Sequence, residues 1–401
     1  MVTRVRKSLL AAAIAITSSS ACLAATSILF VGNSYTFGRI NPVMSYNTAN
    51  VRDLTYEMWL ADATGTNAFE PHPWGGIPGI FKQFTVEAGL DYDVALSTRN
   101  AASLRGHFLN TNPGNWDLRG NIASQVWDKV VLQEQSDEVL PKQPGLASNP
   151  AYSRNYANLI VEFIHSGAAM SYRERDFFPG TTTQERTSAC QAETGASAGT
   201  CNLLRQIPAN PNASAATEVY LYGTWARPNL INAPFTTQTD PVTGAVSFTT
   251  TPAVSFYPSL EAMTEDLHDA FFGLAAANDG IKGVAPVGDA FLKAVLAGAA
   301  TRDMYAANAL SDGRIDLWFD DGTHPSKYGS YLSALVLFAT ITGVDPRTLG
   351  PQEIAARDLK IAVKDVVVLQ QLAAAATGFG IKRNENAAGA VGSGPGWRGG
   401  E

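Results

Sequence analysis

Short apolar runs that alternate with helical stretches are the feature that most constrains the fold of this 401-residue chain. A continuous apolar run bounded by turn residues is typical of a strand that is covered on both faces. We predict five such strands, at Ser27–Val31, Tyr92–Leu96, Lys129–Leu132, Glu218–Tyr222 and Gly283–Val287. The alternation predicts an α/β fold, a three-layer α/β/α sandwich around a mostly parallel, roughly five-stranded sheet like that of the flavodoxins.

The predicted helices lie between these strands and after the last one. Apolar residues at helical spacing indicate them at Ile77–Ala88, in a polar stretch that ends near Trp127, and at Tyr152–Ile164, Leu260–Ala277, Tyr328–Thr340 and Pro351–Ala376. We expect one domain over residues 26–385, with loop insertions at 141–216 and 234–258, where polar, Gly and Pro residues are frequent. The Gly-rich tail at 386–401 is expected to be disordered.

The first 25 residues are typical of a secretory signal peptide. Basic residues precede the apolar run Leu9–Ile16, and small residues follow it up to Ala24 and Ala25, where we expect cleavage. The run is much shorter than the roughly 20 residues of a membrane-spanning helix. We therefore predict a secreted or periplasmic protein with no membrane span in the mature chain.

Cys22 leaves a second interpretation of this segment open, in which it is the acylated residue of a lipoprotein. That motif needs a large aliphatic residue three positions earlier, where this chain has Ser19. The lipoprotein is the less favoured alternative.

The charge of the chain excludes some classes of partner. The formal net charge is −7, and removing the three basic residues of the leader takes it to about −10. Neither nucleic acid nor an anionic membrane is expected to bind such a surface. We expect a monomer whose partner is a small-molecule or carbohydrate ester.

Cys190 and Cys201 are the cysteines that remain after cleavage. In an oxidising compartment we expect a disulfide between them, which would stabilise a polar segment by roughly 2–3 kcal/mol. A metal site is the alternative, but no histidine stands near either cysteine. His72, His107, His165 and His268 are also scattered singly, so we predict no metal and no cofactor.

Ser34 stands where the first predicted strand ends. The carboxyl ends of strands in an open α/β sheet face the ligand crevice, so a hydroxyl there can meet a substrate. Asn33 and Ser34 could equally begin a helix, since both residue types are good N-caps.

Asp321 and His324 form the second signal, just ahead of the last apolar stretch. A carboxylate three residues before an imidazole can accept its Nδ1 proton, which leaves Nε2 free to take a proton from a serine hydroxyl. The spacing alone is common and weak evidence.

Together the two signals resemble the first and last blocks of the SGNH/GDSL hydrolases: Gly32-Asn33-Ser34-Tyr35-Thr36 near the mature N-terminus and Asp321-x-x-His324-Pro325 near the C-terminus. The resemblance implies a serine ester hydrolase with Ser34, Asp321 and His324 as its catalytic triad. It also implies an oxyanion hole built from the N–H of Ser34, a glycine N–H after the second strand and an asparagine side chain after the third.

The chain departs from that pattern at both further donors. Ala102 stands where the glycine is expected, and Gln135 aligns with the asparagine, with Gln133 as the alternative. Each missing donor in such a hole costs about 3–4 kcal/mol. A non-catalytic, carbohydrate- or surface-binding protein with a decayed oxyanion hole is therefore the alternative function, and a metal-dependent phosphoesterase is disfavoured by the lack of ligand clusters.

Three residues after the fourth predicted strand could line the substrate pocket: Thr224, Trp225 and Arg227. Ordinary loop packing is the alternative for them.

Ser197 formally matches Gly-x-Ser-x-Gly but lacks the preceding strand that this motif requires, so it is not expected to be a nucleophile. We expect removal of O-acetyl groups from carbohydrate, or cleavage of short-chain esters, with activity falling below roughly pH 6–7 as a catalytic imidazole takes up a proton.

Overall fold

The computed structural model describes residues 24–61, 72–109, 111–112, 116–232, 234–239, 246–249 and 254–379. The predicted signal peptide lies outside the described residues except for Ala24 and Ala25, and the predicted Gly-rich tail lies outside them entirely. In the described part, no helix has the length and apolar character needed to cross a membrane.

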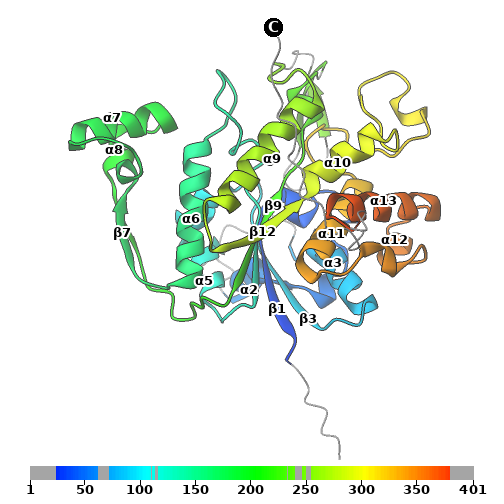
Figure 1. Ribbon diagram of the computed structural model, residues 1–401, viewed down its shortest axis with the longest axis horizontal. Helices are drawn as coiled ribbons and strands as arrows, with labels where there is room; N and C mark the ends of the chain where they lie inside the picture. Colours follow the sequence, from blue (N-terminus) through cyan, green and yellow to red (C-terminus); the bar gives the residue numbers. More distant parts are fainter. Residues whose placement is uncertain are drawn as a thin grey trace, which may run out of the picture.

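A parallel sheet forms the centre of the molecule (Figure 1). Its strands run in the order β12-β9-β6-β1-β3-β2, and every neighbouring pair is parallel. The strands are β1 (Thr26–Gly32), β2 (Arg52–Asp53), β3 (Tyr92–Thr98), β6 (Lys129–Leu132), β9 (Glu218–Gly223) and β12 (Ile281–Pro286). The predicted α/β class is confirmed, and all five predicted strands are present. The sixth, β2, is too short to stand out as an apolar run.

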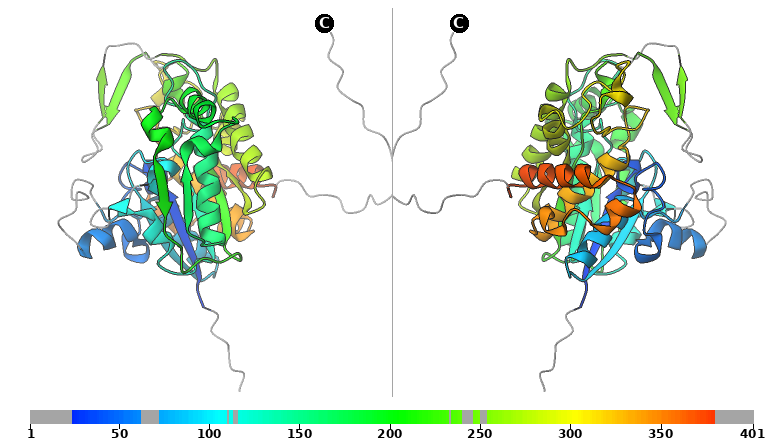
Figure 2. Two further views of the ribbon diagram at one scale, coloured as in Figure 1. Left: turned by 90° about the vertical axis from the view of Figure 1, so that its left-hand side faces the viewer. Right: turned by 90° about the vertical axis from the view of Figure 1, so that its right-hand side faces the viewer.

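Helices cover both faces of the sheet (Figures 1 and 2). One layer contains α3 (Gly76–Glu87) and α11 (Lys327–Thr342), with α13 (Val363–Ala376) packed on the outside of α11. The opposite layer contains α4 (Leu104–Leu109), α6 (Pro150–His165) and α9 (Leu260–Ala276). Because α11 is apolar on all sides, it is buried between the sheet and α13.

The helix that we predicted over Pro351–Ala376 is wrong as a single element. The structure has two helices, α12 (Ile354–Asp358) and α13, separated at Lys360. Lys360 has a φ of 55°, and a residue in this left-handed conformation ends an α-helix. Apolar periodicity alone does not reveal such a break.

The remaining elements are short or peripheral. Helix α10 (Val287–Leu296) packs against α9, α11 and α13. The others are α1 (Ser34–Phe37), α2 (Leu54–Ala61), α5 (Leu118–Ile122) and the antiparallel pair β4 (Thr111–Asn112) and β5 (Trp116–Asp117).

The strand order positions a site at one edge of the sheet. Counting only the five longer strands in chain order, it is the 2-1-3-4-5 order of the flavodoxin-like folds. In such sheets ligands bind at the carboxyl ends of the strands, at the point where the chain reverses its winding direction. That point lies between β1 and β6, which are followed by Ser34 and Gln135 respectively.

The segment predicted as an insertion at 141–216 contains more regular structure than expected. After α6, strand β7 (Met170–Arg173) pairs antiparallel with β8 (Leu204–Ile207), and α7 (Thr183–Thr194) and α8 (Ala198–Asn202) lie between these strands. The predicted disulfide between Cys190 and Cys201 is confirmed and joins α7 to α8.

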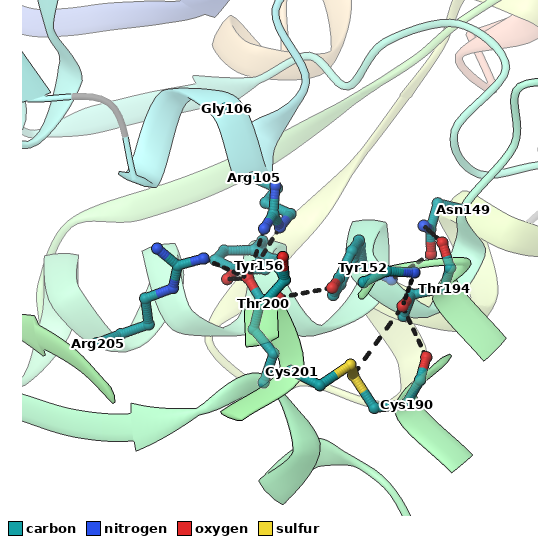
Figure 3. Close-up of polar contacts among 12 residues, drawn as sticks. Arg105, Gly106, Asn149, Tyr152, Tyr156, Cys190, Thr194, Thr200, Cys201 and Arg205 are labelled. Atoms are coloured by element: carbon teal, nitrogen blue, oxygen red, sulfur yellow. Dashed lines mark hydrogen bonds and ion pairs between the residues drawn. A yellow bond between two sulfur atoms is a disulfide. The ribbon is translucent and has the colours of Figure 1, made fainter. Parts of the chain in front are cut away.

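A buried carboxylate fastens this insertion to the body of the molecule. Glu174, which follows β7, is fully buried and pairs with Arg105 of α4 at 2.8 Å. The hydroxyls of Tyr152 and Tyr156 on α6 donate to the same carboxylate, and Arg205 of β8 lies 3.4 Å from it. Figure 3 shows Arg105 of α4, Tyr152 and Tyr156 of α6 and Arg205 of the insertion around this contact.

The second predicted insertion, at 234–258, forms a hairpin in its described part. Strands β10 (Thr236–Thr239) and β11 (Val246–Thr249) pair antiparallel, and the hairpin projects from the body (Figure 2).

Candidate active site

Ser34 follows β1 after one residue, Asn33, and is the first residue of α1. Asn33 caps this helix, and its Oδ1 accepts from the N–H of Tyr35 at 3.0 Å. The turn into the helix is tight, because a Cβ atom on Gly32 would clash with the Thr36 hydroxyl and the Gln133 amide. The Ser34 side chain consequently leaves the sheet at the carboxyl end of β1.

The loop that carries Asp321 and His324 reaches Ser34 from the other end of the chain. Nε2 of His324 lies 2.8 Å from Oγ of Ser34. The loop is held from behind, since Ser326 caps α11 by accepting from the N–H groups of Tyr328 and Gly329. The packed helix α11 therefore fixes where the imidazole can lie.

Asp321 supports His324 with both of its carboxylate oxygens. Oδ2 lies 2.5 Å from Nδ1 of His324, and Oδ1 accepts from the N–H groups of Thr323 and His324, each at 2.9 Å. Burial, which leaves Asp321 only 2% exposed, by itself would raise the pKa of the carboxyl. The hydrogen bonds and the charge of His324 outweigh it, so the pKa lies below its ordinary value.

These three side chains line a cavity of about 250 Å³. Its walls come from the loops after β1, β3, β6 and β9 and from the loop before α11. The lining is mostly polar: Ser34, Tyr35, Arg39, Asn100, Ala101, Gln135, Arg227, Asn229, Asp321, Thr323 and His324.

The structure separates the two glutamines that the sequence left as alternatives. Gln135 lines the cavity. Gln133 is fully buried, and its Oε1 accepts from the N–H of Asn33 at 2.8 Å and from the hydroxyl of Thr36 at 3.0 Å. Its amide nitrogen donates to the carbonyl of Glu134. Gln133 is thus occupied by contacts within the protein, whereas Gln135 faces the cavity beside Ser34.

Ala102, which we expected to supply a backbone donor, lies next to the cavity lining and not in it. The N–H of Ala102 donates to the carbonyl oxygen of Arg99 at 3.3 Å, and Ala102 does not line the cavity. Ala101 lines it, and its φ of 55° is a conformation that glycine adopts more readily. Neither the N–H of Ala101 nor that of Ser34 has a hydrogen-bond partner among the described residues.

Trp225 and Thr224 are buried, which corrects their expected contact with substrate. The Trp225 ring is fully buried between Tyr35, at 4.3 Å between ring centroids, and Phe291, at 4.9 Å. Its Nε1 donates to the carbonyl of Thr323 at 3.1 Å. Trp225 therefore supports the loops beneath the cavity, because stacking on both ring faces leaves no face for a ligand.

Arg227 lines the cavity, where its side chain connects the loop after β9 to the loop after β6. Nη1 donates to the hydroxyl of Ser136 at 2.9 Å and lies 3.4 Å from Asp137. Nε donates to Oδ1 of Asn229 at 3.2 Å. Its charge is thus balanced by Asp137.

His72, His107 and Ser197 form contacts with other protein groups away from the cavity. His72 lies 2.6 Å from Asp53. Nε2 of His107 donates to the carbonyl oxygen of Gly32 at 2.8 Å, and burial lowers the pKa of this imidazole to about 3. Ser197 is the N-cap of α8. Across the ranges that the structure describes, no group of three or more His, Cys, Asp or Glu side chains could hold a metal ion.

Two residues at the site, Asn33 and Glu134, have contacts with site residues that were not predicted from the sequence. Asn33 donates to Gln135, and the Glu134 carboxylate accepts from two backbone N–H groups, those of Leu104 and Gln135. Each adjoins a predicted site residue in the chain, which is the signal that could have identified them.

Comparisons with known proteins found similar solved structures but no matching family. No protein-family model matches the chain, and no curated protein matches it. Among solved structures it is similar to a candidate SGNH hydrolase from Slackia heliotrinireducens (18% identity, TM-score 0.36, covering 79% of this chain and 100% of that one). It is also similar to a DUF4886 family protein from Bacteroides uniformis (12%, 0.42, 88% and 95%) and a candidate GDSL-like lipase from Parabacteroides merdae (14%, 0.36, 79% and 95%).

Proposed function

We propose that this chain is an exported serine ester hydrolase in which Ser34 is the nucleophile, His324 the general base and Asp321 the residue that orients the base. The observation that carries the proposal is the continuous hydrogen-bonded series from Ser34 Oγ to His324 Nε2, at 2.8 Å, and from His324 Nδ1 to Asp321 Oδ2, at 2.5 Å. A nucleophile, a base and a group that orients the base are what this chemistry needs.

In the first step, Ser34 transfers its proton to Nε2 of His324 while Oγ bonds to the ester carbonyl carbon. The tetrahedral intermediate collapses as His324 returns that proton to the leaving alcohol, which leaves an acyl-enzyme on Ser34. Water then attacks the acyl group with His324 again as the base, and the acid and free Ser34 are released. Asp321 keeps its negative charge throughout and stabilises the imidazolium.

The oxyanion would be held by the N–H of Ser34, the N–H of Ala101 and the side-chain amide of Gln135. The two backbone donors have no partner among the described residues, and Gln135 lines the same cavity. Such donors stabilise the negative charge that develops on the carbonyl oxygen. Their presence favours the enzyme over a binding protein with a decayed oxyanion hole, the alternative that the sequence left open.

The cavity favours a short acyl group on a polar alcohol. Its volume of about 250 Å³ and its polar lining, which includes Asn100, Arg227 and Asn229, do not fit a long alkyl chain. We propose O-acetylated carbohydrate as the substrate class. The disulfide is compatible with export, since such bonds persist in oxidising compartments.

Hydrolysis of nitrophenyl esters from acetate to octanoate by the mature chain tests the proposal. Replacing Ser34 by Ala should lower kcat/KM for the acetate by at least about 10³-fold, because the nucleophile is lost. The wild-type chain should prefer acetate to octanoate.

Ser197→Ala is the matched control, because Ser197 formally fits Gly-x-Ser-x-Gly but caps α8. It should leave kcat/KM within about twofold of the wild-type value, at most lowering stability by about 1 kcal/mol through loss of the cap. Equal activity in the wild-type chain and in folded Ser34→Ala would exclude the proposed mechanism.

A further inference from the structure

Asn33 uses every polar atom of its side chain although it is completely buried. Oδ1 accepts from the N–H of Tyr35 at 3.0 Å, which caps α1. Nδ2 donates twice, to the carbonyl oxygen of Ala102 at 3.0 Å and to Oε1 of Gln135 at 2.7 Å. One side chain therefore joins the loops that follow β1, β3 and β6.

The hydrogen bond from Asn33 to Gln135 determines the orientation of the Gln135 side-chain amide. A side-chain amide has an accepting oxygen on one side and a donating NH₂ group on the other. With Oε1 bonded to Asn33, Nε2 lies on the opposite side of the amide. The reversed orientation would bring two NH₂ groups together and leave a buried donor of Asn33 unsatisfied, which costs about 1–3 kcal/mol.

The backbone of Gln135 is fixed separately, by Glu134. Oε1 of this carboxylate accepts from the N–H of Gln135 at 2.7 Å and from the N–H of Leu104 at 2.8 Å. Glu134 is only 2% exposed. Glu134 thus fixes the backbone of Gln135, and Asn33 fixes the orientation of its side-chain amide.

We infer that Asn33 is a positioning residue, which keeps the NH₂ group of Gln135 directed at the ester oxygen on which charge develops. The inference rests on the proposed function and concerns how its oxyanion donor is held. A donor that is already oriented needs no reorganisation during the reaction, which is the source of its effect on the rate. Loss of Asn33 should therefore lower kcat, because the NH₂ group of Gln135 is no longer held in one orientation. KM should change little.

The test compares Asn33→Ser, Gln135→Met and the double variant on nitrophenyl acetate. Serine keeps a capping oxygen for α1 but has no amide to donate to Gln135, and methionine has nearly the length of glutamine without a strong donor. Gln135→Met should lower kcat by about 10²-fold, and Asn33→Ser by at least about tenfold. In the double variant, Asn33→Ser should cost less than about threefold beyond Gln135→Met.

Asn149→Ser is the matched control. Asn149 is likewise an N-cap, of α6: its Oδ1 accepts from the N–H of Tyr152 at 3.3 Å, and its Nδ2 donates to the carbonyl of Thr194 at 3.0 Å (Figure 3). This variant should keep kcat within about twofold of the wild-type value, because the same change at a distant cap touches no oxyanion donor. If Asn33→Ser does not fold, the isosteric Asn33→Asp takes its place, with the same expectation of a lower kcat at an unchanged KM.

Two outcomes would overturn the inference while the proposed function stands. One is that Asn33→Ser lowers kcat by the same factor in the wild-type chain and in the Gln135→Met variant, so that the two effects multiply. The other is a folded Asn33→Ser with wild-type kcat while Gln135→Met is impaired. Activity that survives Ser34→Ala would instead refute the proposed function itself.

Discussion

Asp321 illustrates how a buried carboxylate can remain charged beside an imidazole, here that of His324. Burial alone favours the neutral acid, but hydrogen bonds from two backbone N–H groups and from His324 favour the carboxylate, so the pKa falls below its ordinary value. In the proposed mechanism this charge also fixes the tautomer in which Nε2 of His324 can accept a proton.

Asp321→Asn is predicted to keep the fold and lose most of the activity. The amide oxygen can still accept from the N–H groups of Thr323 and His324, but an NH₂ group would face Nδ1 of His324 and select the wrong tautomer. We expect kcat for nitrophenyl acetate to fall by about 10²–10⁴-fold, with KM nearly unchanged and an unaltered circular dichroism spectrum. A variant that keeps more than about a tenth of the wild-type kcat would contradict this role.

At the residue scale, the position of a side chain could be predicted where its neighbours in the sequence determine it. Asp321 and His324 are close in sequence, and Ser34 ends an apolar strand, so their meeting could be expected. Ala101 and Trp225 could not be placed this way. The first depends on a backbone φ of 55°, and the second on stacking between Tyr35 and Phe291, which are far apart in the chain.

At the element scale, the buried strands were predictable because each is a continuous apolar run. Ile28 to Val31 of β1 are fully buried, as a parallel strand covered on both faces requires. The insertion at 141–216 was predicted but its two strands were not, since β7 and β8 are neither apolar nor adjacent in sequence. Glu174, which follows β7, is held by Arg105 and Tyr152 from other parts of the fold, and such contacts cannot be seen in the sequence of the insertion.

We predict that the disulfide stabilises the insertion and not the active site. In a double variant, Cys190→Ser with Cys201→Ser, the insertion should lose about 2–3 kcal/mol of stability, since the bond closes a short loop between residues separated by 11 positions. Limited proteolysis should cut faster within residues 170–207. The kcat for nitrophenyl acetate should stay within about twofold of wild type, because Glu174 still fastens the insertion to Arg105.

Reduction of the wild-type chain provides the control for this prediction. A reducing agent should reproduce the proteolysis pattern of the double variant and leave the double variant itself unaffected. Faster cutting throughout the chain, in place of cutting confined to the insertion, would show that the bond stabilises the whole domain.

At the scale of the whole molecule, several buried glutamates oppose folding at high pH. Burial raises the pKa of Glu134 to about 7, of Glu138 to about 8 and of Glu353 to about 7, from an ordinary value of 4.5. In Glu138 the charge of Glu134 adds to the effect of burial on the pKa. Between the ordinary and the raised values, the folded chain holds protons that the unfolded chain has released.

The stability of the domain is therefore predicted to fall as the pH rises above about 6.5. The free energy of unfolding decreases with pH wherever the folded state binds more protons than the unfolded state, which for these glutamates is from about pH 4.5 to about pH 8. Buried His107, whose pKa is lowered to about 3, has the opposite effect up to about pH 6.5, where the imidazole of the unfolded chain loses its proton. We expect urea denaturation to give a free energy of unfolding lower at about pH 8 than at about pH 6.5, by on the order of 2 kcal/mol, because above pH 6.5 His107 is mostly neutral in both states.

Glu353→Gln should flatten this pH profile, because glutamine cannot ionise yet can still accept from the N–H of Ala356, as Glu353 does at 2.8 Å. Glu185→Gln is the matched control: Glu185 also lies at a helix start, in the capping box of α7, but its hydrogen bonds to Thr181 and Thr182 lower its pKa. That carboxylate is ionised in both states above about pH 5, so its loss should leave the slope unchanged. A wild-type stability that rises between about pH 6.5 and about pH 8 would mean that these carboxyls are ionised in the folded chain. Their burial would then have to be offset by contacts with water or cations.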